Sequence, residues 1–354
     1  MADGLEYVSD AEPGITRRRV GKGFAFYAPD GTLIKDKALI RWAKSLAVPP
    51  AYEDVWISPV KDGHILATGR DAKGRKQYRY HPRWSAIKGA AKFKHVVAFG
   101  KALPALRARV ERDMSAKGLG RDKVCAIVVR LLETTLIRIG NAHYAKANKS
   151  YGLTTMRHRH LAIEGGSLRF SFKGKSGKRH EVSVRNRRLT RLVGRLQDLP
   201  GQELFQYLDA EGARHRLGST DVNAYLHEVT GQDFTAKDFR TFAATVLAAW
   251  ALAEYERFDS EAAAKRQITA AIEAVAKRLG NTPTICRKSY VHPDVLEGYM
   301  DGSLLAALKA EVEHELSASL DGLEAQEAVV LAFLQRRLAA ASRPPRREKV
   351  PVSA

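Results

Sequence analysis

The sequence predicts an α+β protein, with a small β-rich N-terminal domain followed by a mainly α-helical domain that contains a small β-hairpin. Up to about residue 95, glycines and Asp-Gly pairs separate short apolar runs, a pattern typical of twisted hairpins. Beyond residue 103, apolar residues recur at helical spacing. The length of 354 residues exceeds what one hydrophobic core usually serves, so two domains are expected.

These patterns divide the chain into four parts. Residues 1–16 are acidic and are expected to be a flexible leader, and residues 17–98 form the β-rich domain. Residues 99–342 form the helical domain. Residues 343–354 are basic and rich in proline, and we expect a disordered tail there.

A basic and aromatic hairpin is predicted at residues 69–81 of the β-rich domain. On its second strand Gln77 and Arg79 share one face, and Tyr78 and Tyr80 share the other. A two-stranded ribbon fits the major groove of DNA, where Gln can pair with adenine and Arg with guanine. A solvated edge strand that uses charge against aggregation has the same composition, so both interpretations stay open.

One helix, from about Asp36 to Leu46, interrupts the predicted hairpins. The helical domain is expected to hold seven more, at Leu103 to Lys117, Arg121 to Ile139, Asp221 to Val229, Ala236 to Glu256, Asp259 to Leu279, Leu304 to Leu316 and Leu323 to Leu338.

Tyr290 stands just beyond the helix predicted at Asp259 to Leu279. Ser260 suits the N-cap of that helix and Gly280 suits its C-terminal end. Pro283 prevents the helix from resuming until a new first turn begins. The tyrosine therefore lies on a short basic segment attached to a packed helix. Taken alone, this stretch favours an ordinary tyrosine that packs its ring and solvates its hydroxyl.

Two basic residues break local patterns. Arg138 falls on the apolar stripe of the helix predicted from Arg121 to Ile139, while Glu133 points to a different face. A buried arginine needs an anion, unless its side chain extends to solvent past the helix end. Lys175 lies in the cationic, glycine-containing tip between strands predicted at 168–172 and 180–184. This tip could carry a lysine to a phosphate or be an exposed turn.

The charge balance points to a polyanionic partner. Lys and Arg number 59 against 39 Asp and Glu, which gives a formal charge of +20. Nucleic acid is the usual partner of such a chain, and ribosomal or membrane-surface binding also fits the charge. The chain has no apolar run of about 18 residues and no signal peptide at its N-terminus, so we expect a cytoplasmic, nucleoid-associated protein that does not enter a membrane.

Neither a metal nor another cofactor is expected. Cys125 and Cys286 lie far apart and outside any paired Cys or Cys/His spacing, which argues against a disulfide and against structural zinc. The sequence has no carboxylate cluster with metal-ligand spacing for a two-metal nuclease, and no Gly-rich loop of the kind that hydrolyses nucleotides.

Taken in order, Arg138, Lys175, Arg240 and Tyr290 supply two guanidiniums, an amine and a phenol. This set suits transfer of a phosphodiester. Two arginines can bind the nonbridging oxygens as phosphorus becomes five-coordinate, and the phenol can act as the nucleophile. Lysine can protonate the departing 5′ oxygen. Because Arg240 begins an apolar helix, an ordinary solvated first-turn residue is its alternative interpretation.

The chain resembles the small type IB DNA topoisomerases of bacteria and poxviruses. The matching pieces span nearly its whole length, and their order and spacing together are specific. They are Val48 to Ile57, Gly74 to Tyr80, Ile137 to Asn141, Tyr151 to Thr155, Phe172 to Lys175, Lys237 to Thr241 and Leu279 to Tyr290.

This resemblance implies the catalytic fold shared by tyrosine recombinases and type IB topoisomerases, and a role for each matching residue. Tyr290 would form a 3′-phosphotyrosyl bond with double-stranded DNA, and Arg138 and Arg240 would bind the scissile phosphate. Arg138 with Lys175 would protonate the leaving oxygen. Asn281 stands where many relatives carry histidine; it can donate the same hydrogen bond but cannot become cationic.

Further residues resemble family positions that contact DNA. They are Arg75, Gln77, Tyr78, Tyr80, Tyr144 and Lys237. Because the phosphotyrosyl bond stores the energy of the broken phosphodiester, relaxation of supercoils of either sign would need neither ATP nor metal. One chain carries every required residue, so a monomer is the simplest expectation.

Two other classes remain as alternatives. Tyrosine recombinases share the chemistry, but they commonly place histidine where this chain has Lys237, and their N-terminal domain is usually helical. A nonenzymatic DNA-binding protein accounts for the charge but leaves the ordered catalytic set as a coincidence.

Overall fold

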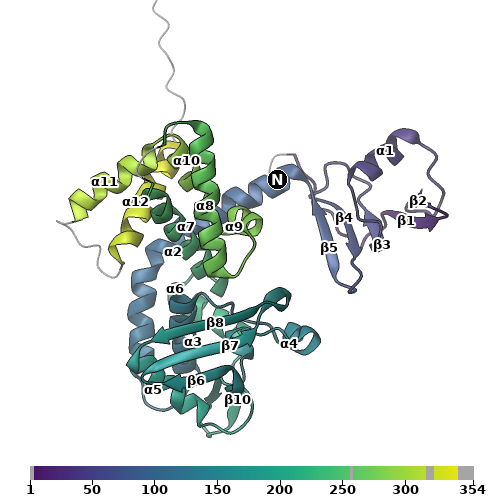
Figure 1. Cartoon of the computed structure of the whole chain (residues 1–354). Coiled ribbons are helices and arrows are strands. Elements are labelled where there is room, and N and C mark those ends of the chain that lie inside the picture. The colour runs from purple at the N-terminus through teal and green to yellow at the C-terminus, as the bar shows by residue number, and fades with distance from the viewer. Residues whose placement is uncertain (1–3, 256–257, 316–322, 342–354) are drawn as a thin grey trace, which may run out of the picture. The chain divides into compact units, whose positions relative to one another are not determined.

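The structure, a computed structural model, describes residues 4–255, 258–315 and 323–341 (Figure 1). It divides into two compact units, Met1–Phe93 and Lys94–Ala354, which we describe separately. The tail predicted at residues 343–354 lies outside the described residues. The predicted α+β class is confirmed, because the first unit is built on a sheet and the second is mainly helical.

The first unit is a five-stranded antiparallel sheet with one helix packed on it. Its strands have the spatial order β2-β1-β3-β4-β5. The strands are β1 (Ile15–Val20), β2 (Gly23–Tyr27), β3 (Glu53–Ile57), β4 (Ile65–Arg70) and β5 (Lys76–Tyr80). The helix α1 (Lys37–Ser45) begins where predicted, because the Asp36 side chain accepts a hydrogen bond from the Ala38 amide at 2.7 Å.

Alternation along these strands produces the core of the first unit. Every second residue of a strand points to the same face of the sheet, and the apolar face of this sheet is covered by α1. The buried residues of this core are Ile15, Phe26, Ala43, Val55, Ile57 and Ala67.

The segment expected to be a flexible leader is instead packed against the sheet from Gly4 onward. Leu5 is buried, and the indole of Trp56 donates a hydrogen bond to the Glu12 carbonyl at 3.0 Å. Asp10 accepts a hydrogen bond from Thr68 and pairs with Lys76 at 2.5 Å. Asp10, one of the acidic residues that suggested a mobile leader, thus has its basic partner on β5.

The helix α2 (Pro82–Ser115) begins well before the predicted start at Leu103 and continues into the second unit. Pro82 is its first residue, a position where the missing amide hydrogen is not needed and the proline ring favours helical geometry.

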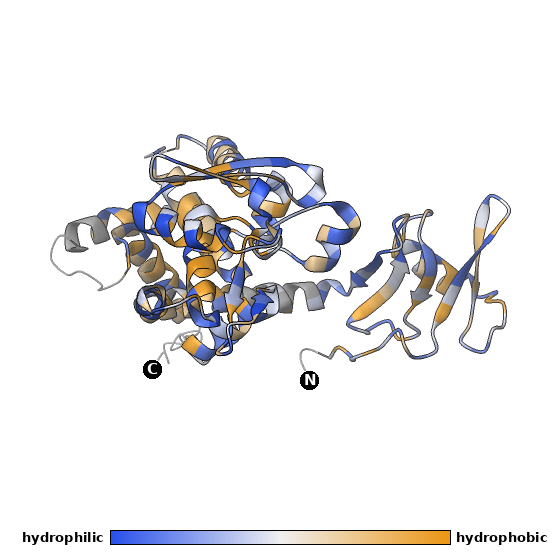
Figure 2. Ribbon diagram, turned by 90° about the horizontal axis from the view of Figure 1, so that it is seen from below, coloured by the Kyte–Doolittle hydropathy of each residue, from blue (hydrophilic) through white to orange (hydrophobic). Residues whose placement is uncertain are grey.

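The second unit packs its helices around α3 and α7. Both helices are buried along most of their length, and Figure 2 shows hydrophobic residues gathered among the helices of this unit. The helices are α3 (Arg121–Thr135), α4 (Ala142–Asn148), α5 (Arg187–Gln197), α6 (Ser219–Thr230), α7 (Ala236–Ala253), α8 (Glu261–Leu279), α9 (Pro283–Ser289), α10 (Pro293–Met300), α11 (Ser303–Glu315) and α12 (Ala325–Ala341).

The predicted hairpin is part of a three-stranded antiparallel sheet, in which its first strand is central and its second lies at an edge. In it β6 (Leu161–Glu164), β7 (Ser167–Lys173) and β8 (Arg179–Arg185) lie side by side (Figure 1). A second small sheet pairs β9 (Gln206–Leu208) with β10 (Arg214–Arg216). The short strands β6, β9 and β10 and the helices α4, α5 and α10 were not predicted from the sequence.

Both predicted ends of α8 are confirmed, but the predicted C-terminal end of α3 is wrong. The Ser260 side chain caps α8 by accepting a hydrogen bond from the Ala263 amide at 3.1 Å, and Gly280 ends it with φ +62°. Helix α3 ends at Thr135, four residues before the predicted end at Ile139, because Leu136 adopts a left-handed conformation with φ +54°. Arg138 therefore does not lie on the helix.

Candidate active site

Tyr290 is held at the C-terminal end of α9, on a backbone tied to α7. The short helix starts at Pro283, and the Tyr290 amide donates to the Cys286 carbonyl at 2.9 Å. The Thr245 hydroxyl, which projects from α7, donates to the Tyr290 carbonyl at 3.2 Å. The tyrosine predicted to stand on a short segment attached to a packed helix is thus fixed by α9 and α7.

Arg240 lies on α7, just over one helical turn before Thr245, and is 3% exposed. Its guanidinium donates hydrogen bonds to the Leu136 carbonyl and, at 2.8 Å, to the Leu279 carbonyl. Both carbonyls belong to helix C-termini, where they lack helical partners and the helix dipole is negative. The alternative interpretation of Arg240 as a solvated first-turn residue is therefore wrong.

The guanidinium of Arg240 lies over the ring of Tyr290, with Cζ 5.3 Å from the ring centroid. Burial, together with the positive charge of Arg138, lowers the pKa of Arg240 to about 10, so the group is charged at neutral pH. Among the described residues, no carboxylate forms an ion pair with it, and its Nε has no hydrogen-bond partner. A buried positive charge that has no carboxylate partner is suited to bind an anion that a ligand brings.

Arg138 lies beside the C-terminus of α8. Its guanidinium donates to Oδ1 of Asn281 and, at 3.4 Å, to the Gly280 carbonyl. The arginine that the sequence placed on an apolar stripe is half-buried on an extended segment that leaves α3. Glu133 does point elsewhere, as predicted, and pairs with Arg107 and Arg130.

Close backbone contact with Gly152 fixes the segment that carries Arg138. The Leu153 amide donates to the Arg138 carbonyl at 2.9 Å. A Cβ atom at Gly152 would lie 2.4 Å from the same carbonyl oxygen, so only glycine permits this approach. The position of the guanidinium therefore depends on a glycine in the motif Tyr151-Gly152-Leu153.

The electrostatic environment favours ionisation of Tyr290. Burial alone would raise the pKa of its hydroxyl, but the charges of Arg240, Arg138 and Lys237 outweigh burial and lower it below the ordinary value of 10.0. Tyr299 shows the opposite effect, because burial, followed by the neighbouring Tyr255, raises the pKa of its hydroxyl.

Asn281 presents a donor into the site. Its Oδ1 is occupied by Arg138, and its Nδ2 is buried without a hydrogen-bond partner among the described residues. Because buried polar groups are almost always paired, this amide is suited to donate to an incoming oxygen.

Lys175 lies at the end of the β7–β8 hairpin. It begins a 3-10 turn, Lys175–Gly177, at the exposed tip between β7 and β8. Within the part of the chain that the structure describes, its amine makes no hydrogen bond or ion pair. The structure confirms the hairpin and leaves the lysine free to reach a bound ligand.

The residues predicted to touch DNA have different surroundings. Tyr78 and Tyr80 on β5 are about half exposed and stack on each other with centroids 5.8 Å apart. Arg75 and Gln77 instead bind Asp71 in the turn before the strand, at 2.8 and 3.0 Å. The two tyrosines therefore form the open surface of this ribbon.

In the second unit, Tyr144 is 50% exposed on α4, and Lys237 is exposed at the start of α7. The charge of Lys237 contributes, after those of Arg240 and Arg138, to lowering the pKa of Tyr290.

Sequence reasoning missed His180 and Thr245. His180 lies on β8 between the hairpin tip and Gly280, where a Cβ atom would come within 2.3 Å of its ring. The signal that could have found it is the alternation of β8, which puts a histidine on the same strand face as Val182 and Val184. No comparable signal marks Thr245, a small residue in an apolar helix.

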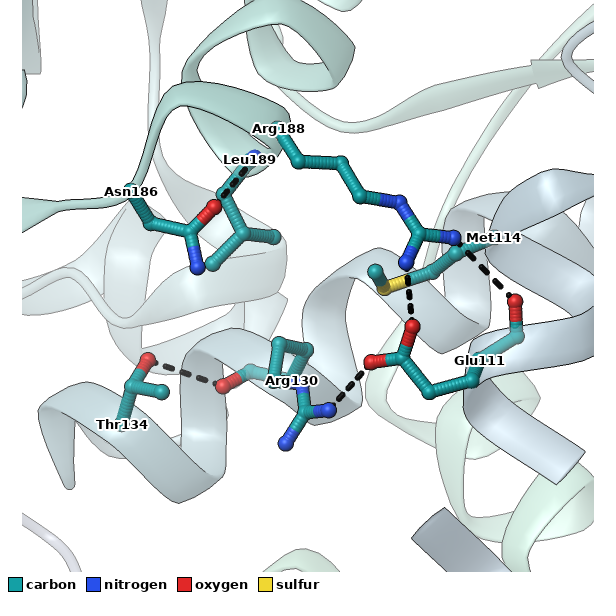
Figure 3. Close-up of a pocket in the computed structure, with 7 residues that line it drawn as sticks. All are labelled: Glu111, Met114, Arg130, Thr134, Asn186, Arg188 and Leu189. Atoms are coloured by element: carbon teal, nitrogen blue, oxygen red, sulfur yellow. Dashed lines mark hydrogen bonds and ion pairs between the residues drawn. The ribbon is translucent and has the colours of Figure 1, made fainter. Parts of the chain in front are cut away.

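A cavity of about 300 Å³ lies away from these residues, between α2, α3 and α5 (Figure 3). Its principal charges neutralise one another, because the Glu111 carboxylate accepts hydrogen bonds from Arg130 and Arg188. None of the predicted site residues lines it. In the described parts of the chain, no group of three or more His, Cys, Asp and Glu residues is placed to hold a metal ion.

Comparison with known proteins identifies the family. Residues 82–319 match the model of the eukaryotic DNA topoisomerase I catalytic core. Residues 23–71 match the N-terminal domain of bacterial DNA topoisomerase IB. The chain belongs to the type IB DNA topoisomerases. It is therefore an isomerase that acts on DNA, and the predicted family is confirmed.

Named relatives agree with this assignment. The DNA topoisomerase 1B of Acanthamoeba polyphaga mimivirus is 34% identical over 297 residues, which cover 81% of this chain and 88% of that protein. The enzyme of the same name from vaccinia virus strain Copenhagen is 22% identical over 273 residues, 76% of this chain and 83% of the relative.

Among solved structures, a pre-cleavage complex of the XerH site-specific recombinase has a TM-score of 0.35 and 13% identity. The alignment covers 61% of this chain and 52% of that one. Within the described residues of this topoisomerase, no helix is long and apolar enough to cross a membrane.

Proposed function

We propose that this topoisomerase relaxes positive and negative DNA supercoils through a transient 3′-phosphotyrosyl bond to Tyr290, without ATP or metal. The observation that carries the proposal is the buried guanidinium of Arg240, which lies over the Tyr290 ring and has no carboxylate partner in the described chain. A phosphodiester bound there would supply the missing anion next to the nucleophile.

In the proposed cleavage step, the phenolic oxygen of Tyr290 attacks the phosphorus and the bond from phosphorus to the 5′ oxygen breaks. The phenol loses its proton, and the departing 5′ oxygen gains one, from Lys175 acting with Arg138. Arg138 and Arg240 bind the nonbridging oxygens, where negative charge accumulates. The Nδ2 of Asn281 donates a further hydrogen bond to one of these oxygens.

The free 5′ end allows the downstream duplex to rotate, and the reverse attack by the 5′ hydroxyl restores the phosphodiester. Because the tyrosyl ester conserves the bond energy, no nucleotide is consumed. A metal-dependent mechanism would take positive charge from metal ions. Here that charge is supplied by Arg138, Arg240, Lys175 and Lys237.

We further propose that residues 17–98 bind duplex DNA and residues 99–342 carry out the chemistry, in a monomer located at the nucleoid. The exposed pair Tyr78 and Tyr80 suits contact with sugars and bases, and the net charge of +20 suits the phosphate backbone. Gln77 would read a base only after exchanging its bond to Asp71 for one to DNA.

Plasmid relaxation in EDTA without nucleotide tests this function. The parent should relax substrates of both signs, and Tyr290→Phe should relax neither while still binding DNA. Relaxation that requires magnesium or ATP, or that survives in Tyr290→Phe, would overturn the proposal. The exposed Tyr255→Phe is the matched control and should retain full activity.

A further inference from the structure

We propose that His180 is a positioning residue, whose imidazole docks the hairpin tip that carries Lys175 against the turn that carries Asn281. The inference rests on the proposed function, because it explains how the exposed lysine is directed to the site. His180 itself contacts neither the phosphate nor the nucleophile in this account.

The imidazole is wedged between two glycine backbones. A Cβ atom at Gly174 would lie 2.5 Å from Cδ2 of His180, and one at Gly280 would lie 2.3 Å from Cε1. Real side chains do not tolerate such distances, so the ring occupies space that only these glycines leave open. One glycine directly precedes Lys175, and the other directly precedes Asn281.

The rest of the ring is also fixed. His180 is paired with Phe172 across β7 and β8, and the two rings stack with centroids 5.3 Å apart and planes at 15°. The Gly174 amide donates to the Lys178 carbonyl at 2.8 Å, which closes the tip next to the imidazole. The histidine thus connects the base of the tip to the end of α8.

The surroundings of the imidazole disfavour its charged form. Burial, followed by the charges of Arg138, Arg240 and Lys178, lowers the pKa of His180 below its ordinary value of 6.5. A charged ring here would repel the same arginines that bind the phosphate. A neutral ring can fill the gap between the two glycines and leave the cationic site undisturbed, while its Nε2 is buried without a partner in the described chain.

This arrangement explains how Lys175 can be exposed and still serve the reaction. The base of the tip is also tied to the segment of Gly152, because the Tyr151 amide donates to the Lys173 carbonyl at 2.8 Å. A small displacement of a catalytic group can cost about 10²-fold in rate. Loss of the wedge should therefore impair the proton transfer from Lys175 more than the attack by Tyr290.

The test compares single-turnover cleavage of two DNA substrates, one ordinary and one with sulfur replacing the bridging 5′ oxygen at the cleavage site. A thiolate leaves without needing a proton, so it bypasses the general acid. His180→Ala should slow cleavage of the ordinary DNA at least tenfold. With the sulfur substrate the defect should largely disappear, as it should for Lys175→Ala.

Several outcomes would overturn the proposal. An equal loss on both substrates would mean that His180 merely maintains the fold, and no loss on either would mean that the wedge is dispensable. If the parent itself forms no covalent complex with either substrate, the proposed function fails rather than this inference alone.

Gly174→Ala supplies an independent check, because its Cβ would displace the ring without removing it. It should reproduce the selective defect of His180→Ala. In the double variant that combines His180→Ala with Gly174→Ala, the ring is absent and the added methyl has space. The second substitution should therefore cause no further loss of cleavage rate. Additive losses in the double variant would contradict the wedge.

Discussion

The guanidinium of Arg240 lies over the aromatic ring of Tyr290, 5.3 Å from its centroid, and both residues are fixed to the same helix, α7. Arg240 belongs to that helix, and Tyr290 is tied to it through Thr245. Two carbonyls at helix ends neutralise part of the arginine's charge and leave the remainder facing the phenol. The nucleophile and its principal cation are therefore held as one unit.

Arg240→Ala should lower the single-turnover cleavage rate by about 10²–10³-fold, the usual cost of removing one transition-state donor. Arg240→Lys should recover only part of this loss, because an ammonium cannot reproduce the planar fork that binds two carbonyls. Rapid-quench cleavage of an oligonucleotide duplex measures both variants. Arg266→Ala, an exposed arginine on α8, is the control, and a comparable loss there would show that bulk charge matters more than position.

Asn281→Ala should reduce cleavage by about 10–150-fold, because hydrogen bonds to charged groups contribute about 1.5–3 kcal/mol. The substitution removes both the acceptor that orients Arg138 and the buried Nδ2 donor. Asn281→His should retain substantial activity, since imidazole can also donate. Similar cleavage rates in the parent and the alanine variant would remove Asn281 from the site.

Gly152→Ala should destabilise the fold by about 1–3 kcal/mol, because the new methyl would collide with the Arg138 carbonyl. In a domain of this size that corresponds to a fall of about 2–4 °C in Tm per kcal/mol. Gly194→Ala is the matched control, because its Cβ would meet only Ile163 at an ordinary 3.7 Å. Thermal unfolding and cleavage rates of both variants test this, and equal Tm values would contradict it.

The pH dependence of stability should reflect His180. Because burial and nearby cations lower its pKa in the folded protein, the unfolded chain binds more protons below pH 6.5, and stability is lost as pH falls through that range. His180→Gln should lose less stability than the parent between pH 7 and 5. His160, whose pKa is also lowered by burial, contributes equally to both proteins. Urea unfolding at a series of pH values measures the difference, and identical slopes would exclude the effect.

Much of this architecture was predictable from local chemistry. The caps Asp36 and Ser260 fixed two helix starts, Gly280 fixed the end of α8, and alternation defined the β7–β8 hairpin. These signals lie within a few residues of the structure that they determine, so no tertiary information is needed to interpret them.

Other features depend on contacts between distant segments. The sequence of the helix carrying Val128 and Leu131 gives no sign of an end at Thr135. The left-handed Leu136 that ends it depends on the path of the segment that follows. The acidic residues near Asp10 resemble a leader until Lys76 is known to lie beside them. The burial of Arg240 follows from two carbonyls contributed by other helices, which periodicity cannot reveal.

A labelled DNA duplex tests most directly whether Tyr290 forms a 3′-phosphotyrosyl bond. A duplex labelled at the 5′ end of the cleaved strand, with a short downstream segment that dissociates, should leave its label attached to the parent protein in EDTA. Peptide mass spectrometry should locate the nucleotide on Tyr290, and Tyr290→Phe should form no adduct. Attachment of a label at the 3′ end of that strand instead, or an adduct that persists in Tyr290→Phe, would contradict the account.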